Sequence, residues 1–366
     1  MVHSDTKAYL LLEDGTFFTG KSFGAKGTSG GELCFNTGMT GYQEVFTDPS
    51  YAGQVLIMNN AYIGNYGVKQ DEVESGSVKI SALICKNITD RYSRMMATGD
   101  LESYLVANNI VAIHDVDTRS LVQHIRSKGV MNCIVSTELS DKAALEQELK
   151  KIPNMKGLNL AAKVSTKAPY LVGSDTATYK VSVLDFGVKQ SMLHIMSSKD
   201  IQLKVFPSTA SFEDLMSFNP NGIFISNGPG DPAAMDDTLD TIKQVLKVEK
   251  PLFGICLGHQ LLARAHDIPT YKMHHGHRGC NHPVINLRTG KAEITTQNHG
   301  FGVDYDSAKQ SDKIDITHVN LNDGTVEGIR IKNKPAFSVQ FHPESTPGTH
   351  DSRYLFDEFI ELMATK

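Results

Sequence analysis

One cysteine lies in a setting that could make it a nucleophile. Cys256 is the middle residue of Gly254–Gly258, a Gly-Ile-Cys-Leu-Gly run between a predicted strand and a predicted helix. On such a sharp turn the nucleophile is lifted clear of the sheet, and glycines are needed because larger side chains would collide. The start of the helix favours the reactive thiolate. A buried, inert cysteine is the alternative, and the flanking glycines argue against it.

A histidine and a glutamate near the end of the chain could supply the base. His342-Pro343-Glu344 follows the strand-like run 336–341. Because alternate residues of an extended chain point to the same side, His342 and Glu344 can face one site, where the carboxylate would fix the imidazole tautomer. Alone, this tripeptide could be ordinary surface sequence. Together with Cys256 it predicts a Cys–His–Glu triad for acyl transfer.

Two further segments could complete a site around the cysteine. The segment 226–232 has two prolines and two glycines in its last five residues and follows a predicted strand. We expect Gly228 in this loop and Leu257 to donate backbone N–H groups to an oxyanion. Residues 297–301 form a polar segment, interpreted as a loop, that could recognise the charged groups of an amino acid. A Pro-Gly loop alone is usually only a turn.

The elements around these motifs alternate between strands and helices. Buried-strand patterns, each separated from the next by a helical pattern, occur at residues 181–186, 203–206, 222–226 and 252–255. This alternation predicts an α/β fold with a doubly wound, mostly parallel sheet, in which functional residues gather at the carboxyl ends of the strands.

The first part of the chain has a different pattern. A hairpin signature at residues 8–18 and a glycine-dense stretch after it predict a β-rich α/β domain. Residues 153–179 lack periodicity and contain breaking residues, so we interpret them as a linker. The predicted division is therefore an N-terminal domain at 1–152, a linker at 153–179 and a catalytic domain at 180–366.

Composition and charge argue against several classes of protein. The chain of 366 residues has a formal net charge of -5 and no basic run, so we expect no nucleic-acid partner. No apolar stretch approaches the ~20 residues that span a bilayer, and no secretory signal pattern is present, so we expect no membrane partner. The 5 cysteines are scattered without a CxxC pair, which indicates free thiols in a cytoplasmic protein.

A histidine-rich stretch raises the question of a metal site. Residues 272–282 contain Lys272, Arg278 and four histidines, which are His274, His275, His277 and His282. Imidazoles are common metal ligands, but the basic neighbours indicate a surface loop. We therefore expect no bound metal in this chain.

The combination of motifs resembles the class I glutamine amidotransferases. The resemblance is carried, in chain order, by the loop at 226–232, the elbow with the His259-Gln260 that follows it, the run 298–301 and the run 342–344. Further runs resemble the small-subunit family of carbamoyl-phosphate synthases; they lie at residues 35–44, 47–51, 65–67, 115–119 and 185–189. The resemblance covers nearly the whole chain.

The resemblance implies a role for each matching residue. Cys256 would be the nucleophile, His342 the base, and Glu344 the group that orients His342. Glutamine or its oxyanion would be bound by Ser50 of the N-terminal domain and by Gly228, Gly230, Leu257, Gln260, Asn298, Gly300 and Phe301.

The resemblance also implies a partner. The family forms a glutamyl-thioester and channels ammonia to a large subunit, which makes carbamoyl phosphate for arginine and pyrimidine biosynthesis. The sequence has no G-x-x-x-x-G-K-[ST] loop and is too short for ATP-using synthetase halves. We therefore expect no cofactor here, ATP and Mg²⁺ on the large subunit, and a heterodimer that could assemble further.

Two other functions remain open from the sequence. A stand-alone hydrolase of γ-glutamyl compounds would use the same triad, but would not need residues 1–150 in this form. A catalytically silent regulatory subunit would keep the fold without the chemistry, and the intact Cys256, His342 and Glu344 argue against it.

Overall fold

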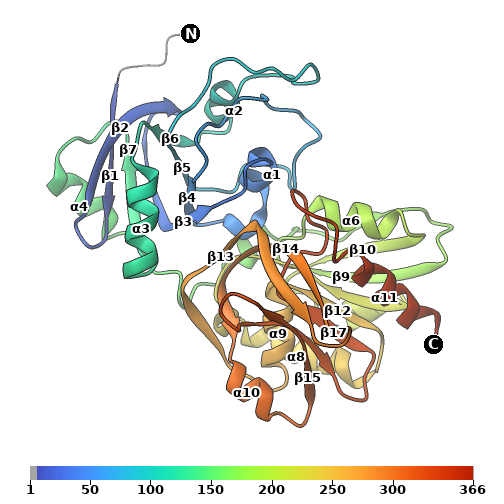
Figure 1. The fold of residues 1–366 in the computed structure, drawn as a ribbon. Helices are drawn as coiled ribbons and strands as arrows, with labels where there is room; N and C mark the ends of the chain where they lie inside the picture. The colour runs from blue at the N-terminus through green and yellow to red at the C-terminus, as the bar shows by residue number, and fades with distance from the viewer. Residues whose placement is uncertain (1–5, 366) are drawn as a thin grey trace. The chain divides into compact units, whose positions relative to one another are not determined.

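The computed structural model describes residues 6–365, which divide into two compact units between Met155 and Lys156. The first unit is built around a closed barrel with the strand order β1-β2-β6-β5-β4-β3-β7 (Figure 1). Its strands are β1 (Lys7–Leu12), β2 (Phe17–Gly24), β3 (Thr28–Asn36), β4 (Gln54–Met58), β5 (Ala82–Cys85), β6 (Val111–His114) and β7 (Asn132–Ser136). Closure leaves no strand edge unpaired.

Four α-helices complete the described part of the first unit. The helices are α1 (Tyr42–Thr47), α2 (Leu101–Ala107), α3 (Thr118–Lys128) and α4 (Lys142–Leu149). The predicted hairpin is confirmed, since β1 and β2 pair antiparallel with Leu11 opposite Phe17. The apolar side of α3 is made by Leu121, Val122 and Ile125, which are buried, whereas its charged residues stay exposed. This separation of an apolar side from a charged side explains why the segment folds as an amphipathic helix.

The second unit contains one large sheet of ten strands in the order β14-β13-β15-β16-β17-β12-β11-β9-β10-β8. They are β8 (Tyr170–Val172), β9 (Tyr179–Asp185), β10 (Ile201–Pro207), β11 (Gly222–Ile225), β12 (Leu252–Ile255), β13 (Thr270–Asn286), β14 (Lys291–Val303), β15 (Ile314–Asn320), β16 (Val326–Ile331) and β17 (Ala336–Val339). The helices are α5 (Ala161–Val164), α6 (Gln190–Ser197), α7 (Phe212–Ser217), α8 (Asp236–Lys247), α9 (Leu257–Arg264), α10 (Tyr305–Gln310) and α11 (Tyr354–Ala364).

Helices cover both faces of this sheet, as the doubly wound prediction requires. Alternate strand residues enter different cores: Leu184 and Leu252 pack with α7, α8 and α9. Val183 and Phe253 pack on the opposite face with α6 and α11 (Figure 1). Because both faces are buried, these strands read as continuous apolar runs rather than alternating ones. The predicted α/β fold class is confirmed.

Half of the large sheet was not predicted from the sequence. The neighbours β10, β9, β11, β12 and β17 run parallel, but β13 to β16 extend the sheet in antiparallel fashion. Residues 272–282 and 297–301, both interpreted as loops, lie within β13 and β14. Several of their polar side chains, among them His277, Arg278 and Gln297, are buried, so these strands lack the apolar pattern by which a strand is recognised.

Part of the segment predicted as a linker belongs to the large sheet. Residues 170–172 form β8, which pairs antiparallel with β10, and residues 161–164 form the short helix α5. The strand has only three residues, two of them exposed, so its sequence carries no strand pattern. The predicted domain boundaries themselves stay a prediction. Among residues 6–365, every helix is too short or too polar to cross a bilayer.

A cluster of aromatic rings around Phe253 stabilises the large sheet. The Phe253 ring is fully buried and lies 4.5 Å from the Phe337 ring centroid and 5.6–5.8 Å from the rings of Phe224, Phe356 and Phe359. We expect Phe253→Ala to lower the free energy of unfolding by about 3–5 kcal/mol, because it leaves a cavity among these rings. Urea unfolding measures the change. Leu321→Ala, at a site 51% exposed, is the control, and an equal loss in both variants would contradict the prediction.

Candidate active site

The predicted nucleophile lies at a strained corner between β12 and α9. Cys256 has φ 54° and ψ -103°, a backbone conformation that a side chain rarely adopts. A Cβ at Gly258 would lie 2.3 Å from the Ile225 carbonyl oxygen, and one at Gly254 would lie 3.0 Å from the Gly258 backbone. Both glycines are therefore required by the close approach of neighbouring backbone. The structure agrees here with the nucleophile elbow that the sequence indicated.

Parallel pairing brings three parts of the site to one edge of the sheet. β12 lies between β11 and β17, with Gly254 opposite Ile225 on one side and Ile255 opposite Val339 on the other. The Cys256 N–H donates to the Val339 carbonyl oxygen at 2.9 Å. Because parallel strands end at the same edge, the glycine-rich loop and the His342 segment flank the cysteine.

His342 and Glu344 face one another, as the sequence predicted. His342 Nδ1 lies 2.8 Å from Glu344 Oε1, and both side chains are almost fully buried. The backbone is held by a 2.8 Å hydrogen bond from the His342 N–H to the Thr296 carbonyl. The Arg353 guanidinium donates to the Glu344 carbonyl at 3.1 and 3.3 Å. These bonds fix the segment after β17 that carries both side chains.

A buried lysine, to which the sequence analysis gave no role, completes this group. Lys189 Nζ lies 2.8 Å from Glu344 Oε1 and 3.0 Å from the Thr346 carbonyl oxygen. Lys189 immediately precedes α6, just beyond the carboxyl end of β9. A lysine at that edge of a parallel sheet could have been noticed from the sequence, since such edges gather functional side chains.

Opposing effects set the pKa values of the pair. Burial lowers the pKa of His342, but the Glu344 carboxylate and the nearby Cys256 sulfur outweigh it, so the pKa lies above its usual range. Burial raises the pKa of Glu344, but the charges of Lys189 and His342 outweigh it, so that pKa is lowered. The structure therefore favours an imidazolium between a carboxylate and the cysteine. His342 Nε2 is buried and has no hydrogen bond that meets ordinary geometry among residues 6–365.

Three predicted substrate-binding residues of α9 and β14 lie around the cysteine. The Gln260 side chain donates to the Phe301 carbonyl at 2.9 Å and to Gln340 Oε1 at 3.0 Å. The Cys256 sulfur lies 3.7 Å from the Asn298 carbonyl oxygen. Gly300, which was also predicted to bind the substrate, lies between Asn298 and Phe301 on β14. The structure brings these positions together.

The predicted oxyanion donors lie on two sides of the corner. Leu257 is the first residue of α9, where a backbone N–H has no intrahelical partner. In the loop after β11, a Cβ at Gly228 would lie 2.2 Å from the Phe186 carbonyl oxygen, and Gly230 has φ 103°. The loop thus packs tightly and needs glycine at both positions.

Ser50 belongs to the first unit. It lies in the short 3-10 helix Pro49–Tyr51, where the Ser50 N–H donates to Asp48 Oδ1 at 2.9 Å, and it is buried. Its predicted contact with glutamine stays a prediction.

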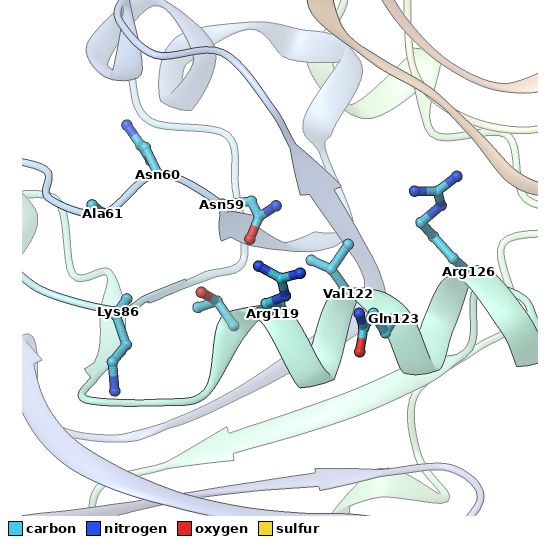
Figure 2. Close-up of a pocket in the computed structure, with 9 residues that line it drawn as sticks. Asn59, Asn60, Ala61, Lys86, Arg119, Val122, Gln123 and Arg126 are labelled. Carbon is cyan, nitrogen blue, oxygen red and sulfur yellow. The ribbon is translucent and has the colours of Figure 1, made fainter. Parts of the chain in front are cut away.

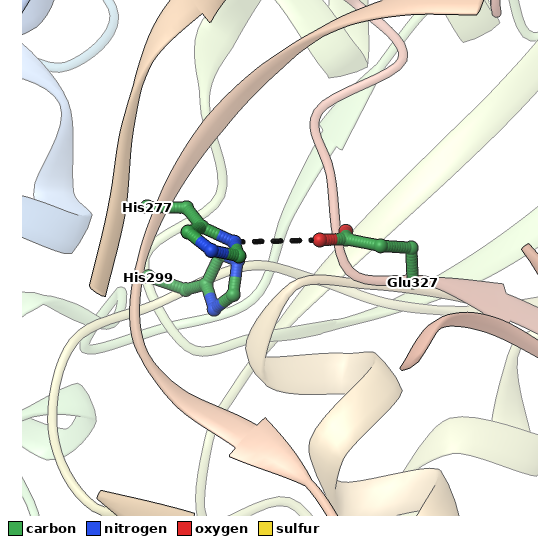
Figure 3. A group of neighbouring side chains, drawn as sticks. All are labelled: His277, His299 and Glu327. Carbon is green, nitrogen blue, oxygen red and sulfur yellow. Dashed lines mark ion pairs between the residues drawn. The ribbon is translucent and has the colours of Figure 1, made fainter. Parts of the chain in front are cut away.

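The histidine-rich strand contains a buried charged network. His277 Nδ1 lies 3.4 Å from Glu327 Oε1 (Figure 3). His277 Nε2 lies 2.8 Å from Asp323 Oδ2, and Nδ1 lies 3.0 Å from Gln297 Oε1. His299 lies 2.9 Å from Gln297 Oε1 and 2.8 Å from the Phe301 carbonyl. His277, His299 and Glu327 are close enough to share a metal ion. Each ring nitrogen of His277 and His299 lies within 3.5 Å of a polar atom, whereas Glu327 Oε2 is buried without a hydrogen-bond partner among the described residues.

The network links a surface carboxylate to the backbone of the site. Burial lowers the pKa of His277, but its bonds to Asp323 and Glu327 outweigh it and raise the pKa to about 9. Burial lowers the pKa of His299 well below its usual range. The Phe301 carbonyl accepts from both Gln260 and His299, so the network supports the strand beside Cys256. The expectation of no metal stays a prediction.

Family comparisons agree with both halves of the structure. The family model "Glutamine amidotransferase class-I" matches residues 182–362. The family model "Carbamoyl-phosphate synthase small chain, CPSase domain" matches residues 10–135. The resemblance drawn from the motifs is therefore confirmed.

Similar proteins match nearly the whole chain. The carbamoyl phosphate synthase small chain of Thermotoga maritima is 46% identical, over 98% of this chain and 98% of its own length. The small chain of Chlorobaculum tepidum is 44% identical, over 97% of each chain. The chain therefore belongs to the carbamoyl phosphate synthase small chain family.

Proposed function

We propose that this chain hydrolyses glutamine through a Cys256–His342–Glu344 triad and delivers ammonia to a carbamoyl-phosphate synthase large subunit. One observation carries the proposal. The only cysteine at a strand–helix corner among residues 6–365 lies beside a buried histidine whose other nitrogen is held by Glu344 at 2.8 Å. Family membership supports the choice of glutamine as substrate.

The proposed reaction is acyl transfer to the cysteine and then to water. The Cys256 thiolate attacks the carboxamide carbon, and the N–H groups of Leu257 and Gly228 stabilise the oxyanion. His342 gives its proton to the leaving nitrogen as the C–N bond breaks, which releases ammonia and leaves a thioester. The neutral His342 then takes a proton from water, whose oxygen attacks the thioester. Glutamate leaves and the thiolate is restored.

The remaining site residues would hold the substrate. Glutamine would be bound by the residues that line the carboxyl edge of the sheet, together with Ser50 of the first unit: Gly228, Gly230, Leu257, Gln260, Asn298, Gly300 and Phe301. Lys189 is a positioning residue in this scheme, because it touches Glu344 rather than the reacting atoms.

The chain would work as part of a heterodimer. Membership of the small chain family supports a large subunit as partner, and ATP and Mg²⁺ would act there, with no cofactor in this chain. All 5 cysteines are free, which supports a cytoplasmic location.

One measurement separates this proposal from the two other functions. Ammonia release from glutamine is measured with and without purified large subunit. Stimulation by the partner supports the proposal, fast turnover alone supports a stand-alone γ-glutamyl hydrolase, and no turnover in either case supports a silent regulatory subunit. The match of residues 10–135 to the small chain family favours the first outcome.

Replacing the nucleophile should abolish the use of glutamine but not the use of free ammonia. We expect Cys256→Ser to lower glutamine hydrolysis by at least about a thousandfold, because the hydroxyl is not ionised by this base. Synthesis from free ammonia by the complex should continue, since the large subunit does not use Cys256. Cys280→Ser, at a half-buried cysteine within β13, is the control and should keep its activity. Equal activity of both variants would rule out Cys256 as nucleophile.

Removing the Glu344 charge should move the pH profile. In the wild type, Glu344 keeps His342 protonated above its ordinary pKa of ~6.5, so activity persists into alkaline solution. In Glu344→Gln burial dominates, and we expect the alkaline limb of kcat/KM to move at least about one unit toward acid. Glu361→Gln, at an exposed site of α11, is the control. An unmoved limb in Glu344→Gln would contradict the orienting role.

Removing the lysine should leave a buried charge without its partner. We expect Lys189→Met to lower the free energy of unfolding by about 3–5 kcal/mol at pH 7. The lowered pKa of Glu344 contributes stability above the unfolded value of ~4.3, and this contribution is lost as the pH falls. The difference in the free energy of unfolding between the wild type and Lys189→Met should therefore become smaller below about pH 4. Urea unfolding at pH 7 and pH 3.5 measures it. Lys291→Met, at an exposed site, is the control, and a pH-independent gap would argue against the ion pair.

A further inference from the structure

Polar side chains gather in two further places, which differ in burial. An open groove of about 410 Å³ lies along α3 in the first unit, and its polar side chains are mostly exposed to water (Figure 2). In the second unit, a group on β13, β14 and β16 is 6% exposed or less; its members are His277, Gln297, His299 and Glu327. Because burial removes water as a partner, each polar atom of this second group needs a partner from the protein or from a ligand.

The Thr295 hydroxyl fixes the orientation of the Gln297 amide. Thr295 Oγ1 donates its only proton to the His282 carbonyl oxygen at 2.9 Å. It can then only accept, so the donor 3.2 Å away is the amide nitrogen of Gln297. The amide oxygen, Gln297 Oε1, therefore faces the two histidines. It lies 3.0 Å from His277 Nδ1 and 2.9 Å from His299 Nε2.

In each imidazole, the nitrogen that points away from Gln297 holds the ring proton. His277 Nε2 lies 2.8 Å from the Asp323 carboxylate, and His299 Nδ1 lies 2.8 Å from the Phe301 carbonyl oxygen. Both oxygens can only accept, so these two nitrogens are the donors. A neutral imidazole has one ring proton. In the neutral rings, His277 Nδ1 and His299 Nε2 therefore present lone pairs to Gln297 Oε1.

A proton on His277 does not satisfy all of these contacts. That proton would serve the contacts of His277 Nδ1 with Gln297 Oε1 and, at 3.4 Å, with Glu327 Oε1. The contact between His299 Nε2 and Gln297 Oε1 would still lack a proton, because burial favours neutral His299. The Asn320 amide donates to Glu327 Oε1 at 3.0 Å, but Glu327 Oε2 is buried without a hydrogen-bond partner among residues 6–365. A cation among these atoms would satisfy the lone pairs together.

The separations of these atoms match a tetrahedral metal site. With bonds of about 2.0–2.1 Å, two ligand atoms of such a site lie about 3.3 Å apart. The measured separations are 2.9, 3.0 and 3.4 Å. His277, His299 and Glu327 each offer a ligand atom within 4.8 Å of the others, and Figure 3 shows the carboxylate opposite the two rings. Metal-bound histidines usually donate their other N–H to a carboxylate or a backbone carbonyl, the partners that Asp323 and Phe301 supply here.

We propose that this buried group binds one divalent metal ion through His277 Nδ1, His299 Nε2 and Glu327 Oε1. Gln297 Oε1 is the fourth ligand, and two imidazoles with two oxygens in tetrahedral geometry suit Zn²⁺. The ion is structural, because four protein ligands leave no open position for chemistry. The expectation of no metal took residues 272–282 for a surface loop, whereas they lie within β13 and His277 is buried. The inference does not depend on glutamine hydrolysis.

Zinc titration of the full, untagged Cys256→Ser chain tests the site, since this variant removes competing binding at the catalytic thiol. After treatment with a chelator, calorimetry at pH 8 should show one Zn²⁺ per chain with a dissociation constant below about 1 µM. With zinc at about a hundredfold excess over that constant, the midpoint of thermal unfolding should rise by about 5–10 °C. EDTA should reverse the rise.

Substitutions in the same Cys256→Ser background test the ligands. We expect His277→Gln and Glu327→Gln each to weaken zinc binding at least about a hundredfold. Asp323→Asn, at a side chain 43% exposed, should weaken it about 10- to 100-fold, because the carboxylate that orients His277 is lost. His274→Gln, at an exposed site of β13, is the control and should stay within about twofold. Thermal unfolding in EDTA shows that each variant is folded.

Two results would overturn the inference. One is the absence of saturable zinc binding by the Cys256→Ser chain up to about 100 µM, which would mean that the buried group closes without an ion. The other is zinc binding by both His277→Gln and Glu327→Gln within about twofold of the Cys256→Ser chain, which would mean an adventitious ion at another place.

Discussion

The backbone at Cys256 imposes the constraint on which the rest of the site depends. A non-glycine residue with φ 54° costs about 1–3 kcal/mol and persists only where the surroundings hold it. They do so from both sides: the Cys256 N–H is bound to Val339, and the Gly258 N–H is bound to Ser226 at 3.1 Å. Strand pairing with β17 and β11 thus fixes the corner. The same pairing delivers the His342 segment and the glycine-rich loop to it.

Buried charge is the second requirement of the site, and it is balanced within a few side chains. An ionised Glu344 with no exposed surface would be costly if unpaired. Lys189 and His342 both bind its Oε1 at 2.8 Å, so the carboxylate shares its charge with two partners. This arrangement raises the pKa of His342, which favours its protonated form beside the sulfur. In the proposed reaction, the proton that ammonia needs is therefore present before the attack.

The antiparallel part of the large sheet positions residues of the site. β14 carries Asn298 and Phe301 toward the cysteine, and the network of His277, Gln297 and His299 fixes the same strand by hydrogen bonds. Polar residues replace an apolar core here, and they hold backbone carbonyls in defined positions.

The sequence alone determined the parallel core, the nucleophile elbow and the His-Pro-Glu pair, because each depends on local spacing: glycines around one cysteine, apolar runs of strand length, and residues two apart in an extended chain. Only the tertiary structure decided that Lys189 would meet Glu344 across 155 residues, and that His277 would meet His299 and Glu327. No local pattern encodes such pairings, since they arise from strand order. β13 and β14 were also not predicted, because many of their buried side chains are polar. The hydrogen-bond partners of these side chains are brought close only when the chain folds.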